Sequence, residues 1–134
     1  MKNIYSTIVM LVFTVGTNVF AQGIINRDIT WYTNQSVELH SSVTMDKSGR
    51  IITHGKTTID YVVSDTQTLT FSITKIEGTW ADPNVAGTLT YRVKYQGKPG
   101  KIIIERAATL TAVIDFTEVA PEAMKQKILI TSFQ

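Results

Sequence analysis

The residues with the clearest capacity for chemistry are two histidines, His40 and His54, which lie in a stretch of alternating apolar residues between positions 36 and 76. Both fall at even positions of a predicted hairpin, on the same face as Glu38. Two imidazoles and a carboxylate are ligands that a divalent metal accepts. A solvated polar face has the same composition, and no nearby residue supplies the hydrogen bonds that orient metal-ligating histidines. We favour the polar face and expect neither a metal nor a cofactor.

The same stretch invites comparison with a nucleophilic triad, because Ser41, Ser42 and Asp60 lie near His54 in the sequence. The G-x-S-x-G pattern of a nucleophile elbow is absent, and serine is common in strands. The chain has no cysteine, which excludes thiol catalysis and thiolate zinc sites. We therefore expect a protein that is not an enzyme.

Aromatic residues further along the chain suggest binding instead. Trp80 precedes the loop around residues 82–84, so we place it at a strand end, where loops carry ligand contacts. Tyr91 belongs to the next predicted strand, and Arg106 is expected on the core-facing side near it. We predict that Trp80, Tyr91 and Arg106 contact a ligand. The alternative is that Trp80 plugs the end of a hydrophobic core.

Charge gives little support for nucleic-acid binding. The chain has 13 Lys and Arg against 11 Asp and Glu, and loss of an N-terminal leader with Lys2 brings it closer to neutrality. Arg92, Lys94, Lys98 and Lys101 gather around one turn and could attract an anion. We favour a solvated face, with Arg92 paired to Glu105 across the ladder.

The N-terminus has the pattern of an export signal. Lys2 precedes an apolar run over residues 8–15, and Ala21 is suited to cleavage before Gln22. The run is shorter than the ~20 apolar residues of a membrane-spanning helix, so a retained membrane anchor is the less favoured alternative. We expect a signal peptide over residues 1–21, a single domain over 22–134 without a transmembrane segment, and a secreted or periplasmic location.

Alternation of apolar residues predicts strands through the rest of the chain. A first strand covers 29–33 and ends at 34–36, with Trp31 and Tyr32 on opposite faces. A hairpin across residues 46–49 would pair Met45 with Ile51 and Val43 with Thr53. The second arm is expected to be one long strand, 50–64, bent at residue 55.

Later segments continue the alternation. A strand beginning near Leu69 would place Phe71 beside Tyr61. Strands at 89–95 and 101–105 would flank a loop at 96–100 and set Ile102 beside Tyr95. We expect a strand over 107–116, with a helix as the alternative because of its alanines, a short helix over 121–126 and a last strand over 127–133.

Eight or nine one-sided strands predict an antiparallel up-and-down barrel or a two-sheet sandwich. The function we expect is an exported, non-catalytic β-domain that binds a small apolar or mixed ligand at one end. The alternative is a structural or protein-interaction module without a ligand cavity, docked through a strand edge or the Trp31 and Tyr32 face.

Overall fold

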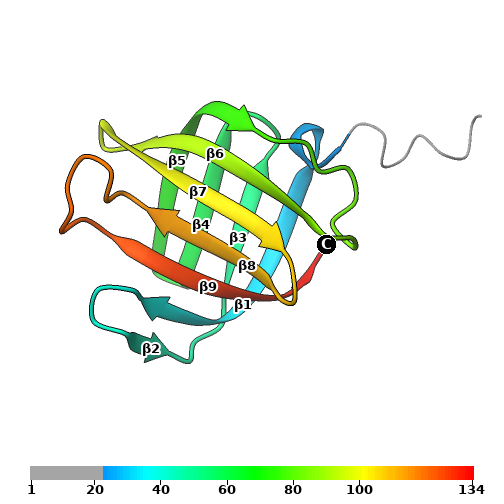
Figure 1. Ribbon diagram of the computed structural model, residues 1–134. Coiled ribbons are helices and arrows are strands. Elements are labelled where there is room, and N and C mark those ends of the chain that lie inside the picture. The colour runs from blue at the N-terminus through cyan, green and yellow to red at the C-terminus, as the bar shows by residue number, and fades with distance from the viewer. Residues whose placement is uncertain (1–22) are drawn as a thin grey trace, which may run out of the picture.

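The computed structural model describes residues 23–134, and the predicted signal peptide with its cleavage site lies outside them. This part of the chain forms nine strands and one turn of 3-10 helix (Figure 1). The elements are η2 (Ile24–Asn26), β1 (Asp28–Glu38), β2 (Val43–Met45), β3 (Gly49–His54), β4 (Thr58–Ser64), β5 (Gln67–Glu77), β6 (Gly87–Tyr95), β7 (Lys98–Arg106), β8 (Leu110–Asp115) and β9 (Lys125–Phe133).

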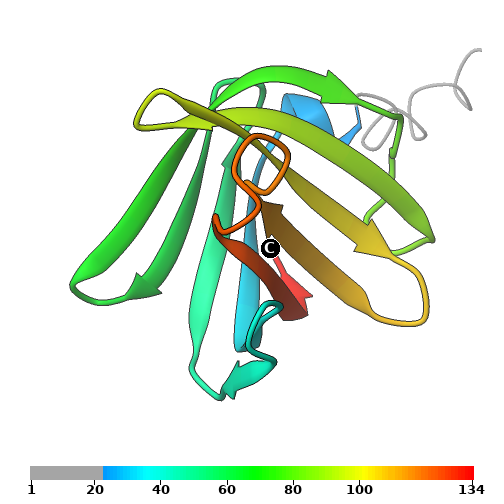
Figure 2. The same cartoon turned by 60° about the vertical axis from the view of Figure 1, so that its left-hand side comes forward.

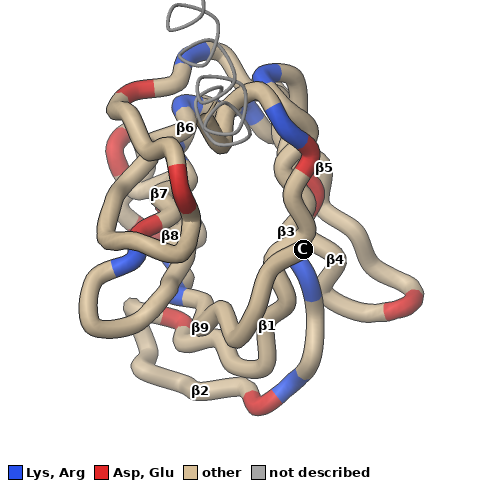
Figure 3. Tube along the Cα trace, turned by 90° about the vertical axis from the view of Figure 1, so that its right-hand side faces the viewer, with Lys and Arg blue, Asp and Glu red and all other residues tan. Residues whose placement is uncertain are grey.

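The strands close into an antiparallel barrel. Strands β3 to β9 pair in chain order, and β1 pairs with both β3 and β9, which closes the ring of eight strands. The short β2 is an extra strand that pairs with β1 alone. Figure 3 views the ring along its axis. The all-β prediction is confirmed, and of the two architectures expected, barrel and sandwich, the barrel is correct.

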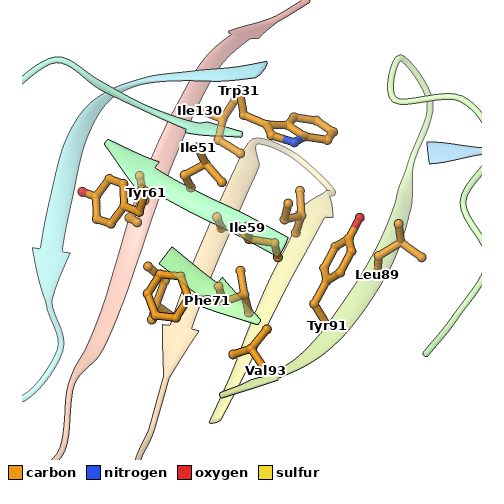
Figure 4. Packing of buried hydrophobic residues seen from close by; sticks show 14 of the residues in the cluster. Trp31, Ile51, Ile59, Tyr61, Phe71, Leu89, Tyr91, Val93 and Ile130 are labelled. Carbon is orange, nitrogen blue, oxygen red and sulfur yellow. The ribbon is translucent and has the colours of Figure 1, made fainter. Parts of the chain in front are cut away.

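Alternation correctly separates the inner from the outer face. Trp31 is fully buried, whereas the neighbouring Tyr32 is 38% exposed on the outside. Inward side chains from all eight barrel strands fill the interior, and Figure 4 shows Ile59, Phe71 and Tyr91 converging there. Closure buries one face of each ring strand and gives each of them a partner on both sides.

The expected first hairpin is wrong. Residues 34–36 do not end the first strand, because β1 continues through them with bulges to Glu38. The carboxylate of Glu38 then accepts hydrogen bonds from the backbone N–H groups of His40 and Ser41, at 3.1 and 2.7 Å. The chain reverses at this point, and β2 folds back so that Met45 lies opposite Ser36. Trp31, and not Met45, is therefore the partner of Ile51.

The long strand expected over 50–64 is two strands. Gly55 adopts a positive φ, which glycine tolerates without steric cost. Thr57 donates its backbone N–H to the carbonyl of His54 at 3.0 Å, which makes a tight turn. Ile51 consequently pairs with Tyr61. The next register is also shifted, since Tyr61 lies opposite Leu69 and not Phe71.

The loop expected over 96–100 is a two-residue turn. Gln96 and Gly97 both have positive φ values, and Lys98 already pairs with Tyr95. Positive φ at both central residues is what a type I′ turn requires. The partner of Ile102 is thus Tyr91 and not Tyr95.

The helix expected over 121–126 is absent. Residues 116–124 form an irregular loop, and Phe116 donates its N–H to the carbonyl of Met124 at 2.9 Å across the loop ends. This pairing extends the β8–β9 ladder, so the chain returns to strand geometry before a helix can propagate.

Candidate ligand-binding site

At one end of the barrel, here called the closed end, side chains fill the interior, and a hollow of 320 Å³ lies between η2, the β3–β4 turn and residues 73–76 of β5. This end holds η2, the turn between β3 and β4, and the loop between β5 and β6, and Ile24 donates its N–H to the carbonyl of Trp80 at 3.2 Å. The indole of Trp80 stacks on that of Trp31 with ring centres 6.1 Å apart. Gly87 leaves the room for it, since a Cβ there would overlap the indole. Trp80 therefore plugs the core at this end.

The three residues predicted to contact a ligand already have protein partners or are buried. Trp80 is 6% exposed and donates Nε1–H to the carbonyl of Val85 at 3.0 Å. Arg106 donates Nε–H to the carbonyl of Pro83 at 2.6 Å. Tyr91 lies fully buried in the middle of β6, and burial raises the pKa of its phenol well above the usual range. Ligand contact by these residues stays a prediction, and for the buried Trp80 and Tyr91 it would require the packing around them to open.

The opposite end, here called the open end, contains two adjoining hollows. Figure 2 turns this end forward and shows the loop of residues 116–124 in front of the barrel. The larger hollow has a volume of 340 Å³ and lies between the β6–β7 turn and this loop; its apolar lining is Leu69, Tyr95, Phe116, Ala123 and Met124. Gln96 and Lys98 complete the lining.

The smaller hollow, of 220 Å³, adjoins the first through Leu69 and Met124, which line both. Tyr61, Val63 and Met45 add apolar surface. Its polar lining consists of Ser36, Gln67 and Gln126. The open end thus offers a divided apolar space with hydrogen-bonding groups at its edge, the composition that small-molecule sites share.

Aromatic rings form the floor of the larger hollow, because Tyr95 and Phe116 line it and both pack against the buried Phe71. The ring of Phe71 lies 5.3 Å from that of Tyr95 and 5.9 Å from that of Phe116. Phe116 fits closely over Gly100, where a Cβ would overlap its ring. This floor is packed against buried residues, so a ligand in the larger hollow need not displace the core.

Ion pairs hold the loop of residues 116–124 against the barrel wall. Glu118 accepts from Arg92 at 3.0 Å and lies 3.4 Å from the ammonium of Lys101. Arg92 also pairs with Glu77 at 2.7 Å, so the expected pairing with Glu105 is wrong. The hydrogen bonds from Arg92 lower the pKa values of both Glu77 and Glu118.

A second contact joins the loop to the β1–β2 hairpin. His40 donates Nε2–H to the carbonyl of Ala123 at 2.8 Å, and Leu39 donates its N–H to the carbonyl of Lys125 at 2.9 Å. The loop is thus fixed on two sides of the open end.

The two histidines do not share a site. His40 lies in the β1–β2 turn at the open end, whereas His54 ends β3 near the closed end, 3.0 Å from Asp60 and 3.8 Å from Asp28. The expected common face depended on the incorrect first hairpin. Within residues 23–134, no three His, Asp or Glu side chains gather to hold a metal ion.

Most residues that line the open end carry no distinct signal in the sequence. Leu69 and Tyr95 alternate like any core residues, and Met124 lies in the segment predicted to be a helix. A usable signal is the Gln96-Gly97 pair, because a type I′ turn there places Lys98 opposite Tyr95.

Comparisons of the chain with models of protein families, with curated proteins and with solved structures find no match. In the part that the structure describes, no helix is long and apolar enough to cross a membrane. A function for the barrel must therefore be argued from its own residues.

Proposed function

We propose that this protein is an exported, non-catalytic β-barrel that binds a small apolar or mixed ligand at its open end. The observation that carries this proposal is the pair of hollows that meet at Leu69 and Met124 above the aromatic floor. Small-molecule sites typically have volumes of about 300 to 1,000 Å³. The larger hollow, of 340 Å³, is by itself large enough for a small ligand.

The lining suits a ligand with an apolar body. Rings and aliphatic groups from Leu69, Phe116 and Met124 would replace water around it. Such apolar burial contributes roughly 25 cal/mol per Å² before the costs of association. The unbranched thioether side chain of Met124 can adapt to different shapes. Glutamine side chains at the edge can hydrogen-bond a single polar group.

Native mass spectrometry of the protein exported from its full-length gene tests the proposal. We expect excess mass that disappears on denaturation. Ala123→Trp places a bulky ring in the larger hollow and should abolish that excess. Val119→Trp adds the same ring to the same loop at a position that is 64% exposed and outside both linings, so the excess mass should persist.

Three outcomes would count against ligand binding or export. Equal excess mass in the two variants would place the ligand elsewhere. Absence of any excess mass, followed by failure of decanoate, decyl phosphate, 1-decanol and decyltrimethylammonium to bind, would refute the binding function. The denatured mass tests export separately, because cleavage after Ala21 leaves Gln22 as the first residue. An uncleaved mass would count against export.

One observation favours the second candidate, a protein-interaction module. The β1–β2 hairpin exposes Leu39, Val43 and Met45, whose exposed fractions are 39%, 55% and 50%, and within residues 23–134 β2 has an unpaired outer edge. An edge strand with apolar neighbours can accept a strand from a partner. A dimer without bound small molecules in the same spectra would favour this candidate over ligand binding.

A further inference from the structure

Among the described residues, a single charged side chain lines the two hollows, and it is the cation Lys98. It faces inward because it lies opposite Tyr95 in the β6–β7 ladder, and directly opposed residues share a face of the sheet. Lys94, on the same hairpin, lies opposite Pro99 and is outside both linings. Strand geometry thus places Lys98 in the lining of the larger hollow and Lys94, also near the open end, outside both linings.

Among residues 23–134, Lys98 has no acidic partner. Within residues 23–134 no carboxylate forms an ion pair with its ammonium, whereas Arg92, Lys101 and Lys125 all form ion pairs. The linings of both hollows, as far as the structure describes the chain, also contain no Asp or Glu. A bound anion would therefore meet a cation whose charge is not already compensated, with no acidic side chain in the wall to repel it.

The form of a lysine side chain defines where that anion would lie. Lysine can lay its aliphatic stem along apolar surface while its ammonium stays in water. Here the stem would border Tyr95 and Phe116, and the ammonium would lie at the rim. A ligand could then place an apolar chain on the aromatic floor and a negatively charged group beside the ammonium at the rim.

We propose that the ligand of the open end is a single-chain amphiphile with one anionic head group. Its chain occupies the space around Leu69, Phe116 and Met124, and its head group pairs with Lys98. This inference rests on the proposed ligand-binding function and adds the chemical class of the ligand.

The experiment measures the affinity of the full-length-gene product for probes with the same chain and different heads: decanoate, decyl phosphate, 1-decanol and decyltrimethylammonium. The wild-type protein should bind both anions more tightly than the cation. Lys98→Glu should weaken decanoate binding roughly three- to tenfold and tighten binding of the cation, because an exposed attractive pair becomes a repulsive one. Lys94→Glu makes the same change of net charge and should leave the affinities for decanoate and for decyltrimethylammonium within about twofold of the wild-type values. Thermal unfolding of each variant checks that it is folded, and Lys98→Gln gives a milder second variant.

The outcomes separate the two proposals. Equal affinity for the anions and the cation would overturn the anionic head group, and so would equal effects of Lys98→Glu and Lys94→Glu. If 1-decanol still binds in either case, the ligand site itself stands. Failure of all four probes to bind would refute the ligand site itself. Tighter binding of decanoate or of decyl phosphate identifies the head group, and either result supports an anionic one.

Discussion

Replacement of Phe116 by alanine tests whether its ring forms the floor of the larger hollow at the open end. The ring is 6% exposed, packs against Phe71 and fills the space above Gly100. Phe→Ala substitutions in protein cores cost about 3 to 5 kcal/mol. One side of this ring borders a hollow and has few contacts to lose, so we expect a loss of about 3 kcal/mol in the free energy of unfolding. For a domain of this size the melting temperature should fall by about 12 °C.

Urea unfolding followed by circular dichroism measures this loss directly. Val119, in the same loop, is 64% exposed, so Val119→Ala serves as the control. That control should change stability by less than about 0.5 kcal/mol. If Phe116→Ala is no more destabilising than the control, the ring is not packed as described. The larger hollow would then lack its floor, and the ligand site would lose its structural basis.

Three further substitutions test other parts of the barrel. Thr53→Val removes the hydroxyl that accepts the indole N–H of Trp31 at 3.2 Å. The free energy of unfolding measured in urea should fall by about 1 to 2 kcal/mol, whereas an unchanged value would mean that another group accepts the indole N–H. Glu118 accepts hydrogen bonds from Arg92, which lower the pKa of its carboxyl group. Its contribution to stability is therefore present above its ordinary pKa and is lost as the pH falls through the lowered pKa. Unfolding free energies measured between about pH 6 and about pH 3 should therefore fall less in Glu118→Gln than in the wild type, and equal slopes would refute the ion pair. Gln96 has a positive φ in its type I′ turn, a conformation that asparagine tolerates better. Gln96→Asn should raise stability by about 0.5 kcal/mol, seen as a higher melting temperature, and a lower melting temperature would contradict that turn.

The strand content and the two faces of each strand could be predicted from alternation, but the points of chain reversal could not. Residues 50–64 alternate on both sides of Gly55, and a bend and a full turn leave the same pattern. The turn is decided by the positive φ of Gly55 and by the hydrogen bonds of Thr57 to the carbonyl of His54. Glu38 acts similarly at the first reversal, where its carboxylate caps backbone groups that the sequence pattern does not identify.

The candidate site was harder to predict because it depends on the contrast between the two ends of a closed barrel. The sequence predicts Trp80 at a strand end, but only the packing of η2 and Trp31 against it shows that it fills the barrel interior at the closed end. Leu69 and Met124 become a shared wall because β5 and the loop of residues 116–124 meet, although they are far apart in sequence. Such long-range contacts leave no local periodicity.

Titration with 1-decanol, followed by NMR of methionine methyl groups and tryptophan indoles, tests most directly which end binds. Met124 lines both hollows and Met45 lines the smaller one, whereas Trp31 and Trp80 lie at the closed end. We predict that the Met124 methyl signal shifts saturably while both indole N–H signals stay in place. Saturable shifts of the indoles with an unchanged Met124 signal would place the ligand at the closed end and contradict the open-end site.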